Sequence, residues 1–294
     1  MGQRLDADRV TQVPDLEALR LLAVSAAERG GELLSRSRTV DPHLEVRLKR
    51  WSGSNGLTTD LATSLDVAID HRVRQVVFSR RPFDSLLSEE LPVVTGTSEW
   101  RWVIDPLDGT TNQVQGIPHT CVSVSCESRT PSGDWSAAAA AVHDPLRVET
   151  FSASRGGGAQ LTTLDGREHL RRRATRPGEA VVATELSYDV AHRAEQLAQL
   201  ALVVPHVRDV RMTGSSALDL CWVAAGRLDG FWEDELGRWD WSAAALVVSE
   251  AGGRVTPFGT GVVAGAGAVH EFLLDRLVRG ASAEDSVRRP TAPQ

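Results

Sequence analysis

The sequence has few of the features that mark membrane-bound, secreted or disulfide-stabilised proteins. No stretch approaches the roughly 20 consecutive apolar residues of a membrane-spanning helix, and the polar N-terminus has no apolar segment of a secretory signal. Gly2 follows the initiator methionine, but Asp6 stands where a myristoylation motif needs Ser or Thr. The cysteines fit neither a disulfide framework nor a metal site (Cys121, Cys126 and Cys221). These absences predict a cytoplasmic protein with reduced cysteines and no membrane partner.

The chain also lacks an excess of positive charge. Lysine and arginine number 32, and aspartate and glutamate number 39, so the formal net charge is −7. A negative total does not favour a nucleic-acid polymer as a partner. Hydrophobic residues make up 41% of the 294 residues and charged residues 24%, which is typical of a folded chain rather than a disordered one. This length is comfortable for two domains of ordinary size.

The spacing of apolar residues changes along the chain. Apolar residues recur at helical spacing over residues 15–35 and 64–79, which predicts two amphipathic helices. Four apolar or alternating segments between residues 100 and 153 then predict a mostly antiparallel sheet. The glycine run at 156–158 and the basic stretch at 169–173 are interpreted as turns and solvated surface. Predicted strands and helices alternate through the last third of the chain.

These patterns predict two halves. We expect an N-terminal α+β half over residues 14–150 and a smaller C-terminal α/β half over residues 151–280. The polar or proline-rich ends, residues 1–13 and 281–294, are expected to be loose tails.

The most informative segment is an apolar strand that ends in two aspartates, Asp105 and Asp108, followed by Gly-Thr-Thr-Asn. Pro106 ends the strand ladder and fixes φ, so both carboxylates are expected at the mouth of the sheet. Two like charges this close repel each other unless a cation lies between them, and all-oxygen ligands favour Mg²⁺ over zinc. The alternative is a plain Asp-Pro turn, which explains neither the Thr-Thr-Asn sequence nor the other acids.

Other acidic residues lie at the ends of predicted elements or beside apolar runs: Asp66, Glu89, Glu90 and Asp240. Each has a structural alternative, because Asp66 fits a helix-surface charge, the glutamate pair a solvated loop and Asp240 a helix N-cap. Taken together they predict one cluster, in which Asp66, Glu89 and Asp240 converge with the two strand-end aspartates on hard cations.

Two segments resemble signatures of a known family. Residues 105–112 closely resemble the first signature of the inositol monophosphatase family of Mg²⁺-dependent, lithium-sensitive phosphatases, and residues 239–253 resemble its second. Further similar segments occur in the same order (59–66, 184–186 and 214–229). The resemblance implies an α+β, layered αβαβα sugar-phosphatase fold with a mixed or antiparallel N-terminal sheet. It also implies hydrolysis of a small phosphate monoester, and a homodimer, which is common in the family.

The resemblance also implies metal ligands and catalytic groups. The ligands of two or three Mg²⁺ ions would be Glu89, Asp105, Asp108, Asp240 and the backbone carbonyl of Leu107. Asp66 would pair with Thr110 and help a third, weaker metal site. Thr110 and Glu89 would orient and deprotonate the attacking water.

The implied substrate contacts come from four segments: Gly109, Thr110, Thr111, Gly214, Ser215, Ser216, Glu233 and Asp240. Backbone N–H groups would hold the phosphate at residues 109–111 if a helix begins there. Lys49 shows a weak match to a family position that supplies a positive charge at the outer edge of the site. Gln113 and Arg238 depart from the residues common in relatives, and this leaves the substrate open because specificity depends on such contacts.

Several substrates and two other classes of protein compete with the default, which is inositol-1-phosphate. Histidinol phosphate, a 3′(2′),5′-bisphosphate nucleotide, fructose bisphosphate and another cyclitol phosphate remain open, and Asp234 and Glu235 would suit a substrate with an amine. A haloacid-dehalogenase-type phosphatase needs two aspartates separated by one residue, whereas two residues intervene here. A non-catalytic regulatory relative is disfavoured by the complete set of acids.

Overall fold

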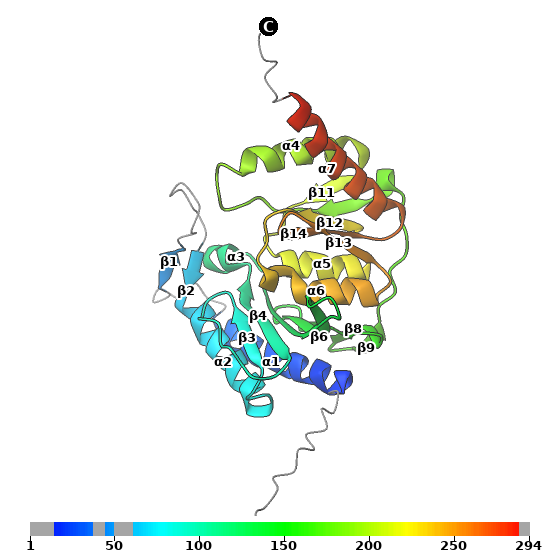
Figure 1. Cartoon of the computed structure of the whole chain (residues 1–294). Coiled ribbons are helices and arrows are strands. Elements are labelled where there is room, and N and C mark those ends of the chain that lie inside the picture. Colours follow the sequence, from blue (N-terminus) through cyan, green and yellow to red (C-terminus); the bar gives the residue numbers. More distant parts are fainter. Residues whose placement is uncertain (1–14, 38–44, 50–60, 288–294) are drawn as a thin grey trace, which may run out of the picture.

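The computed structural model describes residues 15–37, 45–49 and 61–287, and these form five layers of alternating helices and sheets (Figure 1). Two helices cover the outer face of a seven-stranded sheet: α1 (Leu16–Arg36) and α2 (Ser64–Arg80). The middle layer is formed by α5 (Ser216–Ala225) and α6 (Arg238–Glu250). A five-stranded sheet follows, and its far face is covered by α4 (Arg193–Val203) and α7 (Ala268–Val287). The expected α+β fold with αβαβα layering is confirmed.

The larger sheet has the strand order β3-β4-β5-β6-β7-β8-β9. Its strands are β3 (Ser85–Ser88), β4 (Trp100–Asp108), β5 (Cys121–Arg129), β6 (Trp135–Asp144), β7 (Glu149–Ser154), β8 (Gly158–Thr163) and β9 (Gly166–His169). The β3–β4 pair is parallel and every other neighbouring pair is antiparallel. The expected boundary at residue 150 therefore lies inside β7.

The smaller sheet has the order β11-β10-β12-β14-β13. Its strands are β10 (Val181–Ala183), β11 (Asp209–Arg211), β12 (Gly230–Glu233), β13 (Arg254–Phe258) and β14 (Gly261–Gly265). β10 pairs in parallel with β11 and β12, whereas β14 pairs antiparallel with β12 and β13. The chain changes sheet between His169 and Val181. A separate pair joins β1 (Val46–Leu48) and β2 (Leu61–Thr63).

Some elements differ from the sequence-based expectation. His169 ends β9 rather than opening a surface turn, whereas the glycines at 156–158 lie at the β7–β8 turn as expected, with positive φ at Gly156 and Gly158. β13 was not predicted. Helix α7 continues to Val287, so residues 281–287 are helical and not part of a loose tail. Residues 1–13 and 288–294 lie outside the described residues.

Apolar side chains fill each space between layers. One cluster lies between α1, α2 and the larger sheet, a second surrounds α5 and α6, and a third lies under α4 and α7. Asp15 caps α1, since its carboxylate accepts the N–H of Glu17 at 3.0 Å. The helix then approaches the sheet so closely that a Cβ on Gly31 would lie 2.4 Å from the His143 ring. A side chain at position 31 would have to displace the His143 ring.

Helix α6 is attached to the larger sheet at its C-terminal end. The Glu250 carboxylate accepts the backbone N–H groups of Gly156 and Gly158 at 2.8 and 2.9 Å. These bonds hold the β7–β8 turn against the last turn of the helix.

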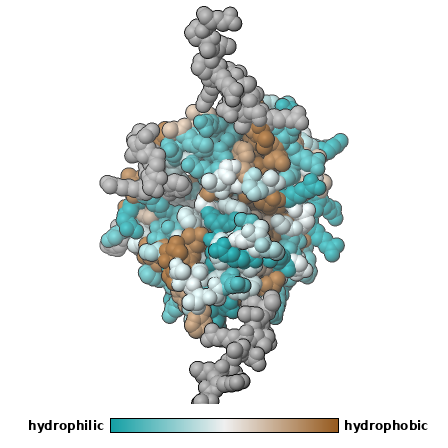
Figure 2. Space-filling view, viewed as in Figure 1, coloured by the Kyte–Doolittle hydropathy of each residue, from teal (hydrophilic) through white to brown (hydrophobic). Residues whose placement is uncertain are grey.

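The surface mixes polar and apolar side chains. On the face shown in Figure 2, hydrophobic residues form separate patches among hydrophilic ones. No helix in the described part of the chain is both long and apolar enough to span a membrane.

Candidate active site

The end of β4 turns sharply into a short helix. The ladder between β4 and β5 shifts register between Asp105 and Asp108, and the N–H of Leu107 donates to Asp105 Oδ1 at 3.0 Å. Gly109 follows with φ 94°, where a Cβ would lie 2.9 Å from a backbone oxygen. Helix α3 then begins at Thr110 and ends at Gln115. The helix start is present as expected, but Pro106 does not end the strand: β4 shifts register there and continues to Asp108, which pairs with Cys121.

Asp66 is connected to this turn through Thr110. Asp66 is fully buried in the first turn of α2, where Thr63 forms a capping box with it. Thr110 Oγ1 lies 2.9 Å from Asp66 Oδ1 and 3.1 Å from the carbonyl oxygen of Leu107. Burial raises the pKa of Asp66, and hydrogen bonds from Thr63 and Thr110 oppose this. The pairing of Asp66 with Thr110 is therefore present as expected.

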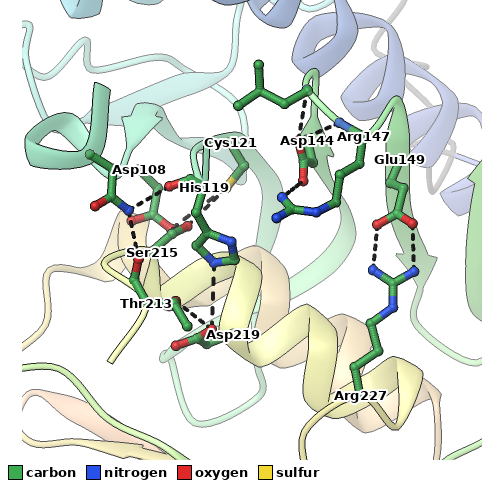
Figure 3. Close-up of polar contacts among 12 residues, drawn as sticks. Asp108, His119, Cys121, Asp144, Arg147, Glu149, Thr213, Ser215, Asp219 and Arg227 are labelled. Atoms are coloured by element: carbon green, nitrogen blue, oxygen red, sulfur yellow. Dashed lines mark hydrogen bonds and ion pairs between the residues drawn. The ribbon is translucent and has the colours of Figure 1, made fainter. Parts of the chain in front are cut away.

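Asp108 is held by the start of α5 (Figure 3). Its Oδ2 accepts the Ser215 hydroxyl at 2.6 Å and the Ala217 N–H at 2.8 Å, and the Cys121 sulfur lies 3.7 Å away. Ser215 is 1% exposed. Ser215 therefore contacts an acidic side chain, and its expected contact with substrate stays a prediction.

The loop before α5 is fixed by two further side chains and by a glycine that allows close packing. Asn112 donates to the carbonyl oxygens of Thr213 and His119 at 2.7 and 2.8 Å. Gly214 has φ 86°, and a Cβ there would lie 2.6 Å from the Asn112 amide. The Glu185 carboxylate accepts the N–H groups of Thr213 and Gly214 at 2.6 and 2.7 Å. The motif residue Asn112 thus joins α3 to the loop that positions Asp108.

A buried pair lies behind this loop. Asp219 accepts the Thr213 hydroxyl at 2.7 Å, and His119 Nε2 lies 3.7 Å from the same carboxylate oxygen (Figure 3). Burial raises the pKa of Asp219, and His119 and Thr213 oppose this. Together with Glu185, this pair leaves the loop little freedom.

Asp240 lies in the first turn of α6. Its Oδ2 accepts the N–H of Gly237 at 2.6 Å, and the carbonyl of the preceding residue, Trp239, accepts the Ser123 hydroxyl at 3.4 Å. This places the helix start against β5, the neighbour of the strand that carries Asp105.

Four acids from three segments of the chain interact electrostatically: Glu89, Asp105, Asp108 and Asp240. Burial raises the pKa of Asp105 well above its usual range, and the charges of the other three acids raise it further. Burial also raises the pKa of Asp240 well above its usual range, with added repulsion from Glu89 and Asp108. A cation would relieve this repulsion, and the donor set consists of oxygen atoms, so these residues fit a hard metal ion.

The four acids are neighbours, but their side chains are not arranged around a common metal position. Among the described residues, no three His, Cys, Asp or Glu side chains are already arranged to hold one metal ion. Lys49 forms ion pairs with Glu89 and, at 2.6 Å, with Glu90. Each strand-end aspartate and Asp240 also accepts protein N–H or O–H groups, as described above. The ligand set expected from the sequence therefore stays a prediction.

The second half of the chain contributes an acidic wall next to these residues. Glu233 is 6% exposed and accepts the Ser216 hydroxyl at 2.8 Å. Burial raises the pKa of Glu233 well above its usual range, and Glu185 adds to this. Burial, opposed by the loop N–H groups, raises the pKa of Glu185 to about 8. Across the site, the Thr111 hydroxyl lies 3.2 Å from the Tyr188 hydroxyl.

Three charges that the sequence left open have protein partners. Asp234 contacts His192 at 2.9 Å and accepts the amide groups of two glutamines. Glu235 accepts the Ser187 hydroxyl. Arg238 pairs with the buried Glu127. Asp234 therefore has a partner inside the protein that carries positive charge when protonated, whereas the hydroxyl bonded to Glu235 is neutral. This weakens the basis for expecting a substrate with an amine at Asp234.

Comparison with known proteins gives the family. Residues 15–287 match the model of the inositol monophosphatase family. The chain belongs to that family. It is 40% identical over 291 residues to the inositol-1-monophosphatase SuhB of Mycobacterium tuberculosis, covering 90% of this chain and 96% of the relative. It is 34% identical over 244 residues to the Nus factor SuhB of Pasteurella multocida, covering 82% and 85%.

The fold agrees with this assignment. The crystal structure of the extragenic suppressor protein suhB from Bartonella henselae is similar, with a TM-score of 0.79 and 34% identity, covering 90% of this chain and 99% of that one. Membership in the inositol monophosphatase family makes the chain a metal-dependent phosphoric monoester hydrolase. The haloacid-dehalogenase alternative is excluded.

Proposed function

We propose that the protein hydrolyses inositol-1-phosphate or a related sugar or cyclitol phosphate with the help of Mg²⁺. The observation that carries this proposal is the meeting of four acids from three distant segments beside the Asp66–Thr110–Leu107 contact. A phosphate monoester is doubly negative and repels a nucleophile, so its hydrolysis needs compensating positive charge.

Glu89, Asp105, Asp108, Asp240 and the Leu107 carbonyl would hold two Mg²⁺ ions, and Asp66 would help a third. When bound, Mg²⁺ neutralises phosphate charge and lowers the pKa of a coordinated water. The Lys49 ammonium pairs with Glu89 and Glu90, so it compensates part of the negative charge of these two carboxylates. The proposal includes inhibition of the phosphatase activity by lithium, as in the family.

Thr110 and Glu89 would prepare the attacking water. The Thr110 hydroxyl has Asp66 and Leu107 as acceptors, so its proton is occupied and its lone pair can accept a hydrogen bond from water. Glu89 would accept the proton that the water loses. Asp66 would fix the orientation of the threonine hydroxyl.

The phosphate would lie against the backbone of residues 109–111, and the alcohol part would face the second half of the chain. Gly214, Ser216 and Glu233 would contact its hydroxyl groups. The Glu233–Ser216 pair supplies one carboxylate and one hydroxyl to such a substrate. A polyol fits this carboxylate and hydroxyl, and Asp234 is already paired with His192.

Phosphate release across a substrate panel tests this proposal. We expect Mg²⁺-dependent release with the highest kcat/KM for inositol-1-phosphate, compared with histidinol phosphate, a 3′,5′-bisphosphate nucleotide and fructose bisphosphate. EDTA should abolish release, and an exposed-acid control, Asp134→Asn, should behave as the wild type. A preference for histidinol phosphate would contradict the polyol assignment. No release from any substrate by a metal-bound protein would favour the regulatory alternative.

The homodimer, the cytoplasmic location and the absence of a nucleic-acid partner stay predictions. Large exposed hydrophobic side chains occur in and around α4, which would suit a protein interface: Tyr188, Val190, Leu197, Val204 and Met212. Light scattering coupled to size-exclusion chromatography would give the oligomeric state.

A further inference from the structure

Strand β5 presents a row of buried polar side chains to helix α6. Ser123, Ser125 and Glu127 alternate along the strand, so they share one face. Their exposed fractions are 1%, 1% and 0%. A polar row in the interior is costly unless each member is hydrogen-bonded. Its partners therefore indicate what the row does.

All three side chains bond to the first turn of α6. Glu127 Oε1 accepts Arg238 Nε at 2.7 Å and the Ser242 hydroxyl at 2.6 Å. The Ser125 and Ser242 hydroxyls lie 2.9 Å apart, and Ser123 bonds to the residue before Asp240. Asp240 lies in the middle of the attached turn. The turn is thus held at three points along β5.

The other oxygen of Glu127 faces Arg101 on β4. Arg101 Nη2 and Nε lie 2.6 and 2.7 Å from Oε2. One carboxylate between two guanidinium groups compensates the buried charge. The two arginines differ in what they connect, because Arg101 joins strands that already share ladder bonds. Arg238 joins the larger sheet to the helix that carries Asp240.

We propose that Glu127 and Arg238 are positioning residues that set the place of Asp240 relative to Asp105 and Asp108, and thereby the metal affinity of the group. Apolar packing alone lets a helix slide or rotate by small amounts, whereas directed bonds to one turn fix both its height and its rotation. The proposal rests on the metal site of the proposed function. Neither residue is among the proposed metal ligands or substrate contacts.

Metal binding without turnover tests the proposal. Binding of Mn²⁺ to the full chain is measured by electron paramagnetic resonance with no substrate present, alongside the Mg²⁺ concentration for half-maximal phosphate release. Arg238→Gln should weaken Mn²⁺ binding about tenfold, as losses of groups that orient metal ligands do. Arg238→Lys should recover part of the loss. Arg101→Gln removes the other ion pair of the same carboxylate and should leave the affinity nearly unchanged.

The controls separate the possible outcomes. Equal weakening in Arg238→Gln and Arg101→Gln, or unchanged Mn²⁺ affinity in Arg238→Gln, would overturn the proposal. If Arg238→Gln does not fold, Ser242→Ala removes a smaller part of the same attachment and should weaken binding in the same direction, and unchanged affinity there would overturn it. A wild-type protein that binds Mn²⁺ but releases no phosphate would contradict the proposed function, while the Mn²⁺ comparison would still decide the positioning role.

Discussion

The two faces of strand β5 have different roles, and each face consists of alternate residues of the same strand. On the outer face, Val122, Val124 and Cys126 pack into the apolar cluster under α1 and α2. On the inner face, the serines and Glu127 bond to α6 beside the acids. Burial is complete on both faces, so exposure does not separate them. The outer face supplies free energy of folding, and the inner face supplies position.

The largest expected effect concerns Asp108, one of the acids that lie beside the inner face. Asp108→Asn keeps nearly the same volume but removes one charge from the metal-binding group. Metal ions contribute several kcal/mol of charge stabilisation in the transition state, so kcat/KM should fall at least about a hundredfold. Steady-state phosphate release and circular dichroism would measure the loss and check the fold. A near-normal rate would mean that Asp108 holds no metal.

A substitution on the outer face should affect stability alone. Val124→Ala removes two buried methyl groups, so the free energy of unfolding should fall by about 2 kcal/mol. Denaturant unfolding measures this, and Mn²⁺ affinity should not change. A loss of metal affinity equal to that of an inner-face variant would break the division between the faces.

The neighbouring inner-face residue gives the matched comparison. Ser125→Ala removes one hydroxyl that is bonded to Ser242, so it should cost about 1 kcal/mol of stability. We expect Ser125→Ala to weaken Mn²⁺ binding even though it costs less stability than Val124→Ala. The free energy of unfolding and the Mn²⁺ affinity are measured for both variants. Val124→Ala should show the larger loss of stability, and Ser125→Ala should show the larger loss of Mn²⁺ affinity.

The last prediction concerns pH and the loop that positions Asp108. The pKa of Glu185 is about 8 in the folded protein, against about 4.5 when unfolded. The folded state therefore binds more protons between these values, and the stability that Glu185 contributes falls as pH rises through this window. In EDTA, Glu185→Gln should lose less stability than the wild type between pH 5 and pH 8. Parallel pH profiles would contradict the raised pKa.

The sequence predicted the parts of the site that depend on local pattern. Asp105 and Asp108 come after an apolar run and before Gly109. This local pattern predicts that the strand gives way to a turn within residues 105–112. Asp66 and Thr110 could be paired only through the family resemblance, since 44 residues separate them. The αβαβα layers also came from the resemblance, because apolar spacing alone does not say which helix covers which sheet.

Other features could not be predicted because they depend on packing between distant segments. Glu127 and Arg238 are 111 residues apart, and their pairing exists only once α6 lies on β5. The alternation of serine with valine along β5 was the available signal, and it was interpreted only as a strand. The strands after the glycines at 156–158 were missed because a polar hairpin at a sheet edge has little apolar content.

Helix α6 is attached to the larger sheet at both ends, through its first turn and through Glu250. Attachments at both ends oppose a rotation of the helix away from the larger sheet. The turn that carries Asp240 is therefore held by the larger sheet, whereas the segment around Tyr188 reaches the site separately, through the contact between the Tyr188 and Thr111 hydroxyls. A substitution near Tyr188 can then change what lies opposite Thr111 while the attachment of Asp240 stays as it is.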